Sequence, residues 1–194
     1  KNFFIKGPYM MAEGVNRNKR IYPLEEMQRE VKRYENLMVK TGRAMGELNH
    51  PTTADVDLER ACHLVTEMSQ DGNVFYGKSK VLSTPTGLIV RSLINDGVRV
   101  GMSSRALGQL IPESGQDGVN RVKDFKLVAI DCVADPSFPK AFVNGILESK
   151  QYVVNKYGQF EEAYDNFENK LTTLPTKNTD DYLKQNILKF IKQL

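Results

Sequence analysis

Tryptophan is absent from this 194-residue sequence, and histidine and cysteine occur only twice each. No apolar run approaches the roughly 20 residues of a membrane-spanning helix, and no signal-peptide pattern is visible, so we expect no membrane association. Cys62 and Cys132 are flanked by apolar residues and are not spaced as a Cys-x-x-Cys pair. We therefore expect two reduced core thiols in an intracellular protein, with no metal or other cofactor.

An excess of charge of one sign is also missing. The 27 basic residues exceed the 24 acidic ones by only three, which is too few to indicate a nucleic-acid partner by charge alone. Hydrophobic residues make up 40% of the chain and charged residues 26%, both ordinary for a globular protein. The composition therefore predicts one main domain and no specific nucleic-acid binding.

Local patterns predict strands and helices in alternation. Apolar residues at helical spacing follow Pro23, which suits a first helical turn, and predict a helix over 23–40. An Asp-Gly turn signal at 71–73 joins 58–69 and 74–82 into a predicted hairpin. Further strands are expected at 3–12, 98–111 and 121–137, with a helix at 87–96 that is capped by 84–86 and stopped by Gly97.

The character of the chain changes near Glu148. Beyond it the sequence is polar and rich in charge, and only its end, "DYLKQNILKFIKQL", has the pattern of an amphipathic helix. We therefore predict a domain over residues 1–148 and a polar, partly helical tail over 149–194.

A histidine in a loop is the first candidate for chemistry. His50 lies in "GELNHP", where Pro51 disfavours helical backbone at the residue before it. Histidine is the usual general base of enzymes, because the imidazole titrates near neutral pH. From this segment alone, His50 is either such a base or an ordinary polar loop residue.

Two adjacent serines are the second candidate. They lie in "GMSSRALG", residues 101–108, inside a predicted strand that is otherwise largely apolar. A serine becomes a good nucleophile when a neighbouring base takes its proton. Because strand side chains alternate between faces, only one of Ser103 and Ser104 can face His50. The alternative is a pair of hydroxyls on an edge strand or in a bulge.

A carboxylate inside an apolar strand is the third candidate. Asp131 lies in "LVAIDCVADPS", where an unpaired charge would be costly to bury, so it needs a cationic or hydrogen-bonding partner. An imidazole would serve, as would Lys126 or an arginine. Glu47, three residues before His50, is a second carboxylate that could orient the histidine or brace its loop.

Taken together, these segments resemble the prohead core proteases of T-even-type bacteriophages. The resemblance is carried by "AEGVNRNKRIYP" (12–23), "GELNHP" (46–51), "GMSSRALGQL" (101–110) and "FKLVAIDCVADPS" (125–137), in that order, and it covers residues 3–148. It implies an α+β, mostly β fold related to the herpesvirus assemblin proteases: a closed antiparallel β-barrel surrounded by helices. It also implies a serine endopeptidase that cleaves scaffold, core and major capsid proteins inside the assembling prohead, in the host cytoplasm.

The resemblance assigns roles to individual residues. The family's histidine corresponds to His50 and its nucleophile to Ser103. The third residue of the related enzymes aligns with an alanine or leucine here, and Asp131 lies further along the same strand face, so we expect Asp131 to orient His50, with Glu47 as the alternative. Backbone N–H groups near "SSRALG" are expected to form the oxyanion hole, with Ser104 and Arg105 as further candidates.

The family cleaves after glutamate, with an aliphatic residue two positions earlier. A buried glutamate side chain of the substrate would need a cationic partner, and the basic segment that contains Arg17, Lys19 and Arg20 could supply it or could be structural. The same rule applied to this chain predicts self-cleavage after Glu148, which would remove the tail, and marks Glu113 as a second position.

Two rival functions stay open at this point. The chain could be a non-catalytic capsid or scaffold component that retains the protease fold, with the final helix docking to a partner. A nucleic-acid-binding module is disfavoured by the small net charge and the lack of interleaved aromatic residues. Because related viral proteases are often activated by self-association, we expect a homo-oligomer.

Overall fold

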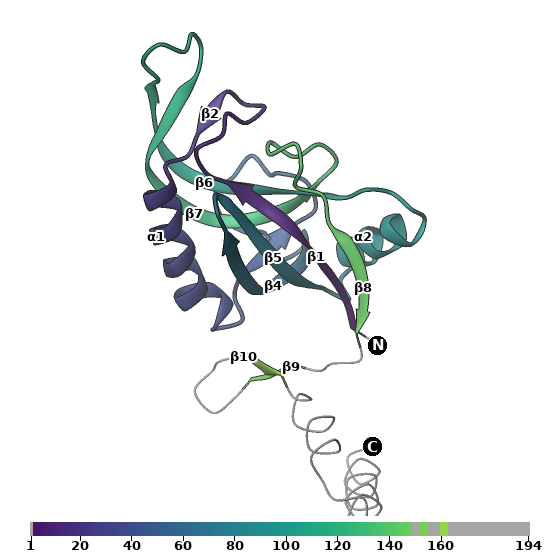
Figure 1. Cartoon of the computed structure of the whole chain (residues 1–194). Helices are drawn as coiled ribbons and strands as arrows, with labels where there is room; N and C mark the ends of the chain where they lie inside the picture. The colour runs from purple at the N-terminus through teal and green to yellow at the C-terminus, as the bar shows by residue number, and fades with distance from the viewer. Residues whose placement is uncertain (1, 149–151, 155–159, 163–194) are drawn as a thin grey trace, which may run out of the picture. The chain divides into compact units, whose positions relative to one another are not determined.

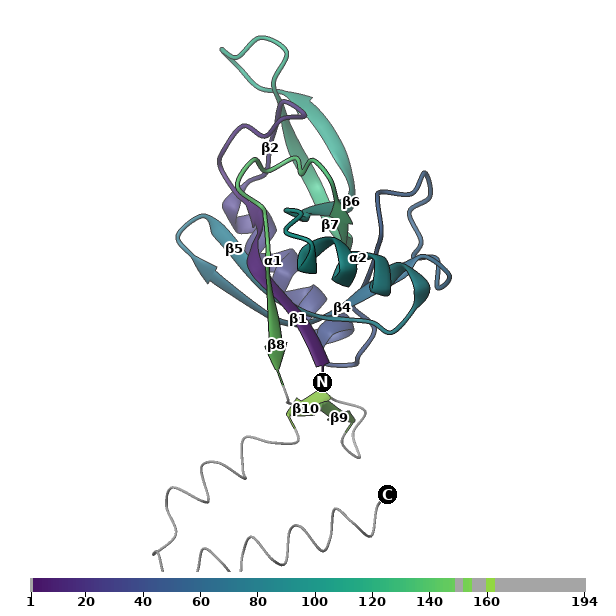
Figure 2. The same ribbon diagram turned by 90° about the vertical axis from the view of Figure 1, so that its right-hand side faces the viewer.

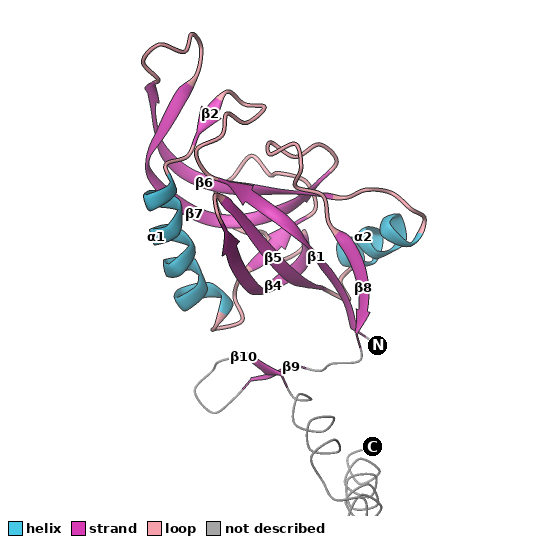
Figure 3. Cartoon of the chain, in the orientation of Figure 1, coloured by secondary structure: helices cyan, strands magenta, loops and turns pink. Residues whose placement is uncertain are grey.

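The fold was obtained as a computed structural model, which describes residues 2–148, 152–154 and 160–162. Strands dominate the described residues, and only two α-helices accompany them (Figures 1 and 3). The strands are β1 (Asn2–Met11), β2 (Arg20–Ile21), β3 (Met45–Glu47), β4 (Ala61–Asp71), β5 (Val74–Val81), β6 (Gly101–Pro112), β7 (Asn120–Val133), β8 (Asn144–Glu148), β9 (Tyr152–Val154) and β10 (Phe160–Glu162). The helical segments are α1 (Leu24–Tyr34), a π-helical turn η1 (Glu35–Val39) and α2 (Pro85–Asn95). The helix expected at 181–194 lies outside the described residues.

The two helices predicted within the described residues are confirmed, and each begins or ends as its sequence signals indicate. The hydroxyl of Thr84 accepts a hydrogen bond from the Gly87 N–H and caps α2. Gly97, with φ of +85°, follows the end of α2 in the left-handed region that glycine adopts at little cost. At the other helix, Lys40 N–H donates to the Glu35 carbonyl at 2.9 Å, so α1 continues into the wider π turn.

No helix of the described part is long and apolar enough to cross a membrane.

The larger sheet has the strand order β3-β4-β5-β1-β8. The predicted hairpin is its centre: β4 and β5 pair antiparallel around a turn in which Gly72 has φ of +56°. β1 joins the hairpin to β8, which runs beside it through the antiparallel pairs from Asn2↔Glu148 to Lys6↔Asn144 (Figure 2). A bulge between Pro8 and Met10 lets β1 pass its proline without leaving the sheet.

The second sheet is formed mainly by the long hairpin of β6 and β7, with β2 as a short third strand. The two strands pair from Gly101↔Val133 to Pro112↔Asn120, and their far end projects from the rest of the fold (Figure 1). Ser103 lies directly opposite Asp131 in this ladder. Antiparallel partners present their side chains on the same face, so the hairpin places these two predicted site residues side by side.

The expected closed barrel is wrong, because no sheet of the described chain closes on itself. Among the described residues, strand pairing near the junction of the two sheets is limited to isolated bridges, Leu48↔Cys132 and Gly101↔Phe142. Helix α1 packs along part of the outer edge of β7, where a strand would have to pair to close a barrel. The carboxylates of Glu26 and Glu30 on α1 accept hydrogen bonds from the N–H groups of Phe125 and Leu127. Between β2 at one end and the Leu48 bridge at the other, this stretch of the β7 edge is thus satisfied by helix side chains and not by a strand.

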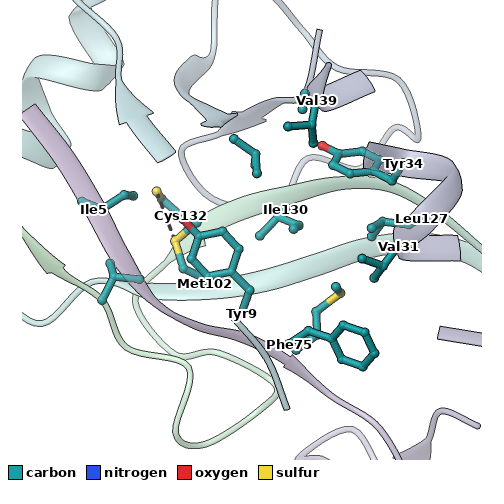
Figure 4. Close-up of a cluster of buried hydrophobic side chains, with 14 of the residues drawn as sticks. Ile5, Tyr9, Val31, Tyr34, Val39, Phe75, Met102, Leu127, Ile130 and Cys132 are labelled. Atoms are coloured by element: carbon teal, nitrogen blue, oxygen red, sulfur yellow. Dashed lines mark hydrogen bonds between the residues drawn. The ribbon is translucent and has the colours of Figure 1, made fainter. Parts of the chain in front are cut away.

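The core lies between the two sheets and α1. Its largest fully buried side chains are those of Tyr9, Tyr34, Phe4, Phe75 and Phe125. Met102 and Cys132, which flank the site residues on β6 and β7, point into this core, with their sulfur atoms 3.8 Å apart (Figure 4). Cys62 and Cys132 are both buried free thiols, as the sequence predicted. The strand faces opposite this core present Ser103 and Asp131.

Candidate active site

The segment that carries His50 is fixed to β7 by its backbone. Leu48 bridges to Cys132, and the Asn49 N–H donates to the Cys132 carbonyl at 2.7 Å. Asn49 has φ of +64°, a left-handed conformation that asparagine tolerates better than most residues. This turn ends β3 and directs the next residue, His50, over the neighbouring Asp131.

His50 and Asp131 are in direct contact. The Nδ1 atom of His50 lies 2.8 Å from Oδ2 of Asp131. The Asp131 side chain is completely buried, whereas 42% of the His50 side chain is exposed. The second ring nitrogen, Nε2, has no hydrogen-bond partner among the described residues. The imidazole is therefore anchored at one nitrogen, and the other is available to a reactant.

Asp131 is held in its charged form by several donors. Its Oδ1 accepts the Glu47 N–H at 2.9 Å and Nη2 of Arg105 at 3.2 Å. Nε of Arg105 lies 3.0 Å from Oδ2, close enough for ion pairing but outside hydrogen-bonding geometry. Burial alone would raise the pKa of Asp131. The hydrogen bonds from His50 and Glu47, with the charge of Arg105, outweigh it and hold the pKa below its usual value.

The two serines of the predicted nucleophile segment face opposite sides of β6. Ser103 pairs with Asp131 and is only 4% exposed, while Ser104 pairs with Ile130 of the core. The Ser103 hydroxyl oxygen lies 3.2 Å from the hydroxyl oxygen of Ser137. In the described part of the chain no hydrogen bond joins Ser103 to the His50 ring. The structure thus places Ser103, and not Ser104, on the face of Asp131.

Within the described chain, Glu47 forms no hydrogen bond or ion pair with His50. It is fully buried, and its carboxylate accepts Nη2 of Arg105 at 2.8 Å and Nε of Arg60 at 3.2 Å. It also accepts the backbone N–H of Asp57 at 2.9 Å. Of the two carboxylates considered from the sequence, Asp131 therefore binds the imidazole, and Glu47 braces the loop that follows it.

Arg105 connects these carboxylates to the loop after His50. Its Nη1 donates to the carbonyls of Thr53, Ala54 and Asp55 at 2.9 to 3.2 Å, while Nη2 donates to Glu47 and Asp131. The side chain is only 9% exposed. Both Nη groups are therefore engaged, and the geometry gives Arg105 the position of an anchor for the loop.

The basic segment reaches the site through only one of its arginines. Arg17 forms an ion pair with Asp135, and its backbone N–H donates to the Ser137 carbonyl at 2.9 Å. Arg20 instead lines a surface pocket beside the loop-ward half of the β6–β7 hairpin, with Tyr22, Leu107 and Phe125 among its neighbours. Within the described chain, Arg20 has no ion-pair partner.

One buried cluster has the ligand types of a metal site. Cys62, His63 and Cys132 offer atoms that all lie within 4.8 Å of one another. However, Nε2 of His63 lies 2.8 Å from the Ile130 carbonyl, and a hydrogen bond with Cys62 together with burial raises the pKa of Cys132 well above its usual range. Nδ1 of His63 has no hydrogen-bond partner among the described residues. Both cysteines pack as buried free thiols of the core.

Sequence reasoning did not identify Ser137. Its only local signal is its place in "DPSFP", where the two prolines end the preceding strand and restrict the backbone around the serine. Pro136 and Phe138 are buried on either side, while Ser137 itself is half-buried. Its proximity to Ser103 depends on contacts across 34 residues of sequence and could not be read from the segment alone.

Comparison with known proteins gives concordant matches. The family described as "Prohead core protein serine protease" matches residues 1–151. The prohead core protein protease of Enterobacteria phage T4 is 41% identical over 144 residues, which span 72% of this chain and 67% of the relative. The solved structure of the bacteriophage T4 capsid assembly protease, gp21, superposes with a TM-score of 0.63 at 37% identity, over 67% of this chain and 80% of that one.

Proposed function

The chain belongs to the prohead core protein serine protease family, and from this membership we propose that it is a serine endopeptidase with Ser103 as its nucleophile. The observation that carries the proposal is the contact of His50 Nδ1 with the buried Asp131, directly opposite Ser103 in the β6–β7 ladder. A histidine held at Nδ1 by an ionised carboxylate presents Nε2 as a general base.

The proposed reaction follows from these positions. His50 takes the proton of Ser103 as its oxygen attacks the scissile carbonyl, and later gives a proton to the leaving amine. Asp131 keeps the imidazole in the required tautomer and stabilises the imidazolium, because its lowered pKa leaves it ionised at neutral pH. The Ser103 hydroxyl has no hydrogen bond to His50 among the described residues, so its proton must be directed to Nε2 of His50 before reaction.

The proposed substrates are phage scaffold, core and major capsid proteins, cleaved after glutamate inside the prohead that assembles in the host cytoplasm. This is supported by the similarity to a protein named capsid assembly protease. Of the basic residues considered for the substrate glutamate, Arg20 lines an open pocket, whereas Arg17 is paired with Asp135. We therefore favour Arg20 as the partner of that carboxylate.

We also propose self-cleavage after Glu148, at the boundary between a protease domain over 1–148 and the tail over 149–194. The Glu148 backbone pairs with Asn2 at the end of β8. A protease binds an extended, unpaired segment, so the end of this strand must separate from β1 first. The cut is therefore expected to be slow in the folded chain.

Labelling by a fluorophosphonate probe tests the nucleophile. Wild-type protein should be labelled on Ser103 and should release the fragment that ends at Glu148, as seen by mass spectrometry. Ser103→Ala should do neither. Ser92→Ala, which removes an exposed hydroxyl on α2, should match the wild type.

Two results would contradict the proposal. Identical fragments from the wild type and Ser103→Ala would exclude self-cleavage. Absence of labelling in folded protein that has been allowed to self-associate would favour the non-catalytic capsid or scaffold component.

A further inference from the structure

We propose that the Ser137 hydroxyl donates a hydrogen bond to the negatively charged oxygen that forms when Ser103 attacks a substrate carbonyl. The inference rests on the proposed function, because it takes Ser103 as the nucleophile. It starts from the hydroxyl oxygens of these two serines, which lie 3.2 Å apart. Among the described residues, Ser137 is the one hydrogen-bond partner of the Ser103 side chain.

The segment around Ser137 is fixed against the strand that carries the nucleophile. Gly101 makes this possible: a Cβ atom there would lie 2.6 Å from Cδ of Pro136, so only glycine lets the proline approach β6. Beyond Ser137, the Ala141 carbonyl accepts the Met102 N–H at 2.7 Å. The segment is thus attached to β6 on both sides of Ser137.

The basic segment supplies a further attachment. The Arg17 N–H donates to the Ser137 carbonyl at 2.9 Å, which fixes the backbone of the serine itself. The Arg17 guanidinium pairs with Asp135, two residues before Ser137. The role of Arg17 is therefore to position Ser137, and it acts through the backbone of that residue.

The proton count decides the direction of the hydrogen bond between the serines. The single hydroxyl proton of Ser103 must pass to Nε2 of His50, so in the reactive arrangement Ser137 donates and Ser103 accepts. When the bond from Ser103 to the carbonyl carbon forms, the π electrons of the carbonyl move to its oxygen. That oxygen is bonded to the same carbon as the attacking Ser103 oxygen. The Ser137 hydroxyl can turn to it without backbone movement and keeps its proton throughout.

The other polar groups considered for this role are placed less well. Both Nη groups of Arg105 are bonded to loop carbonyls and to the carboxylates of Glu47 and Asp131. Ser104 is on the opposite face of β6, in register with Ile130. Of these groups, Ser137 is the one whose hydroxyl lies within hydrogen-bond distance of the Ser103 oxygen among the described residues.

The assignment is tested by measuring the kinetics of three variants. The substrate is a fluorogenic peptide that carries an aliphatic residue two positions before a glutamate. Loss of one oxyanion donor lowers kcat by about 10²–10³. Ser137→Ala should therefore lower kcat by about 10² with KM nearly unchanged, because the hydrogen bond forms only in the transition state. Ser137→Thr keeps the hydroxyl and should recover most of kcat, and Ser92→Ala should equal the wild type.

The outcomes separate this inference from the proposed function. A kcat for Ser137→Ala within about threefold of wild type, or an effect confined to KM, would overturn the role of Ser137 alone. Activity in Ser103→Ala would overturn both. The melting temperature of each variant is the control for folding: a variant as stable as the wild type but low in kcat supports the role. If Ser137→Ala does not fold, Ser137→Thr still tests the role. This variant keeps the hydroxyl, so a folded Ser137→Thr protein with a low kcat would contradict the role of Ser137.

Discussion

Nδ1 of His50, a half-exposed ring, lies 2.8 Å from Oδ2 of Asp131, a carboxylate with no exposed surface. The contact joins residues 81 positions apart and is made possible by the docking of Leu48 and Asn49 on β7. A buried carboxylate is a rigid support, because its other oxygen is held by Glu47 and Arg105. The orientation of the imidazole is therefore set by a buried carboxylate that Glu47 and Arg105 hold in place.

Replacing this carboxylate tests its proposed role. Asp131→Asn keeps the shape of the side chain but removes the charge that fixes the histidine tautomer, and such a change lowers kcat by about 10⁴ in a related arrangement. We expect a loss of this order in peptide cleavage, while Glu47→Gln should retain more activity because the Glu47 carboxylate binds Arg105, Arg60 and a backbone N–H rather than His50. Equal losses in the two variants would contradict the assignment.

Glu47 is expected to matter more for the stability of the fold than for catalysis. Breaking a buried ion pair from one side costs about 3–5 kcal/mol, and Glu47 faces the nearly buried Arg105 as well as the half-exposed Arg60. We expect Glu47→Gln to lower the free energy of unfolding in urea by about 3 kcal/mol, chiefly through Arg105. Glu25→Gln, at an exposed position of α1, is the matched control and should change little. A similar small change for Glu47→Gln would show that the pair is not stabilising.

The lowered pKa of the buried His63 should make the stability of the fold depend on pH. Burial lowers its pKa from 6.5 to about 4, so between these values the unfolded chain binds a proton that the folded chain does not. The free energy of unfolding should therefore fall as the pH falls, by about 2 kcal/mol from pH 7 to pH 5. Urea unfolding of wild type and His63→Gln at several pH values measures the difference in slope. Parallel slopes would mean that His63 titrates normally in the folded protein.

A salt bridge should protect the second possible cleavage position. Both carboxylate oxygens of Glu113 are bound by Arg121, at 2.7 and 3.0 Å, so this glutamate is not free to enter a protease pocket. If the enzyme cleaves after glutamate, Arg121→Gln should speed cleavage after Glu113 several-fold relative to Glu148. Time-resolved mass spectrometry measures both products. The same products from Arg121→Gln combined with Ser103→Ala would show that another protease made the cut.

Local elements were largely predictable from the sequence because their signals are local. Thr84 and Gly97 mark the ends of one helix, and the Asp-Gly turn marks the central hairpin. The short strands β2, β3 and β8 were not predicted, since each exists only by pairing with a distant partner. The barrel expectation failed for a related reason. In the sequence, Glu26 and Glu30 look like ordinary surface charges of a helix, yet they occupy the β7 edge.

The site residues also divide into features with a local sequence signal and features that depend on distant contacts. The sequence alone made His50, Ser103 and Asp131 separately unusual, but only the resemblance joined them, because their proximity depends on sheet register. Their catalytic roles stay predictions. The engagement of Arg105 with loop carbonyls and the approach of Ser137 to Ser103 could not be foreseen, since both are contacts between segments at least 34 residues apart.

The long sequence separation of the site has a consequence for the order of synthesis and folding. Contacts between distant residues form late, because the chain between them must first be closed into a loop. A nascent chain that has emerged only as far as β6 contains both the histidine and the serine but has no carboxylate to hold the ring. If the proposed triad carries the activity, we expect the chain to be inactive while it is being synthesised, because β7 is the strand that completes the triad.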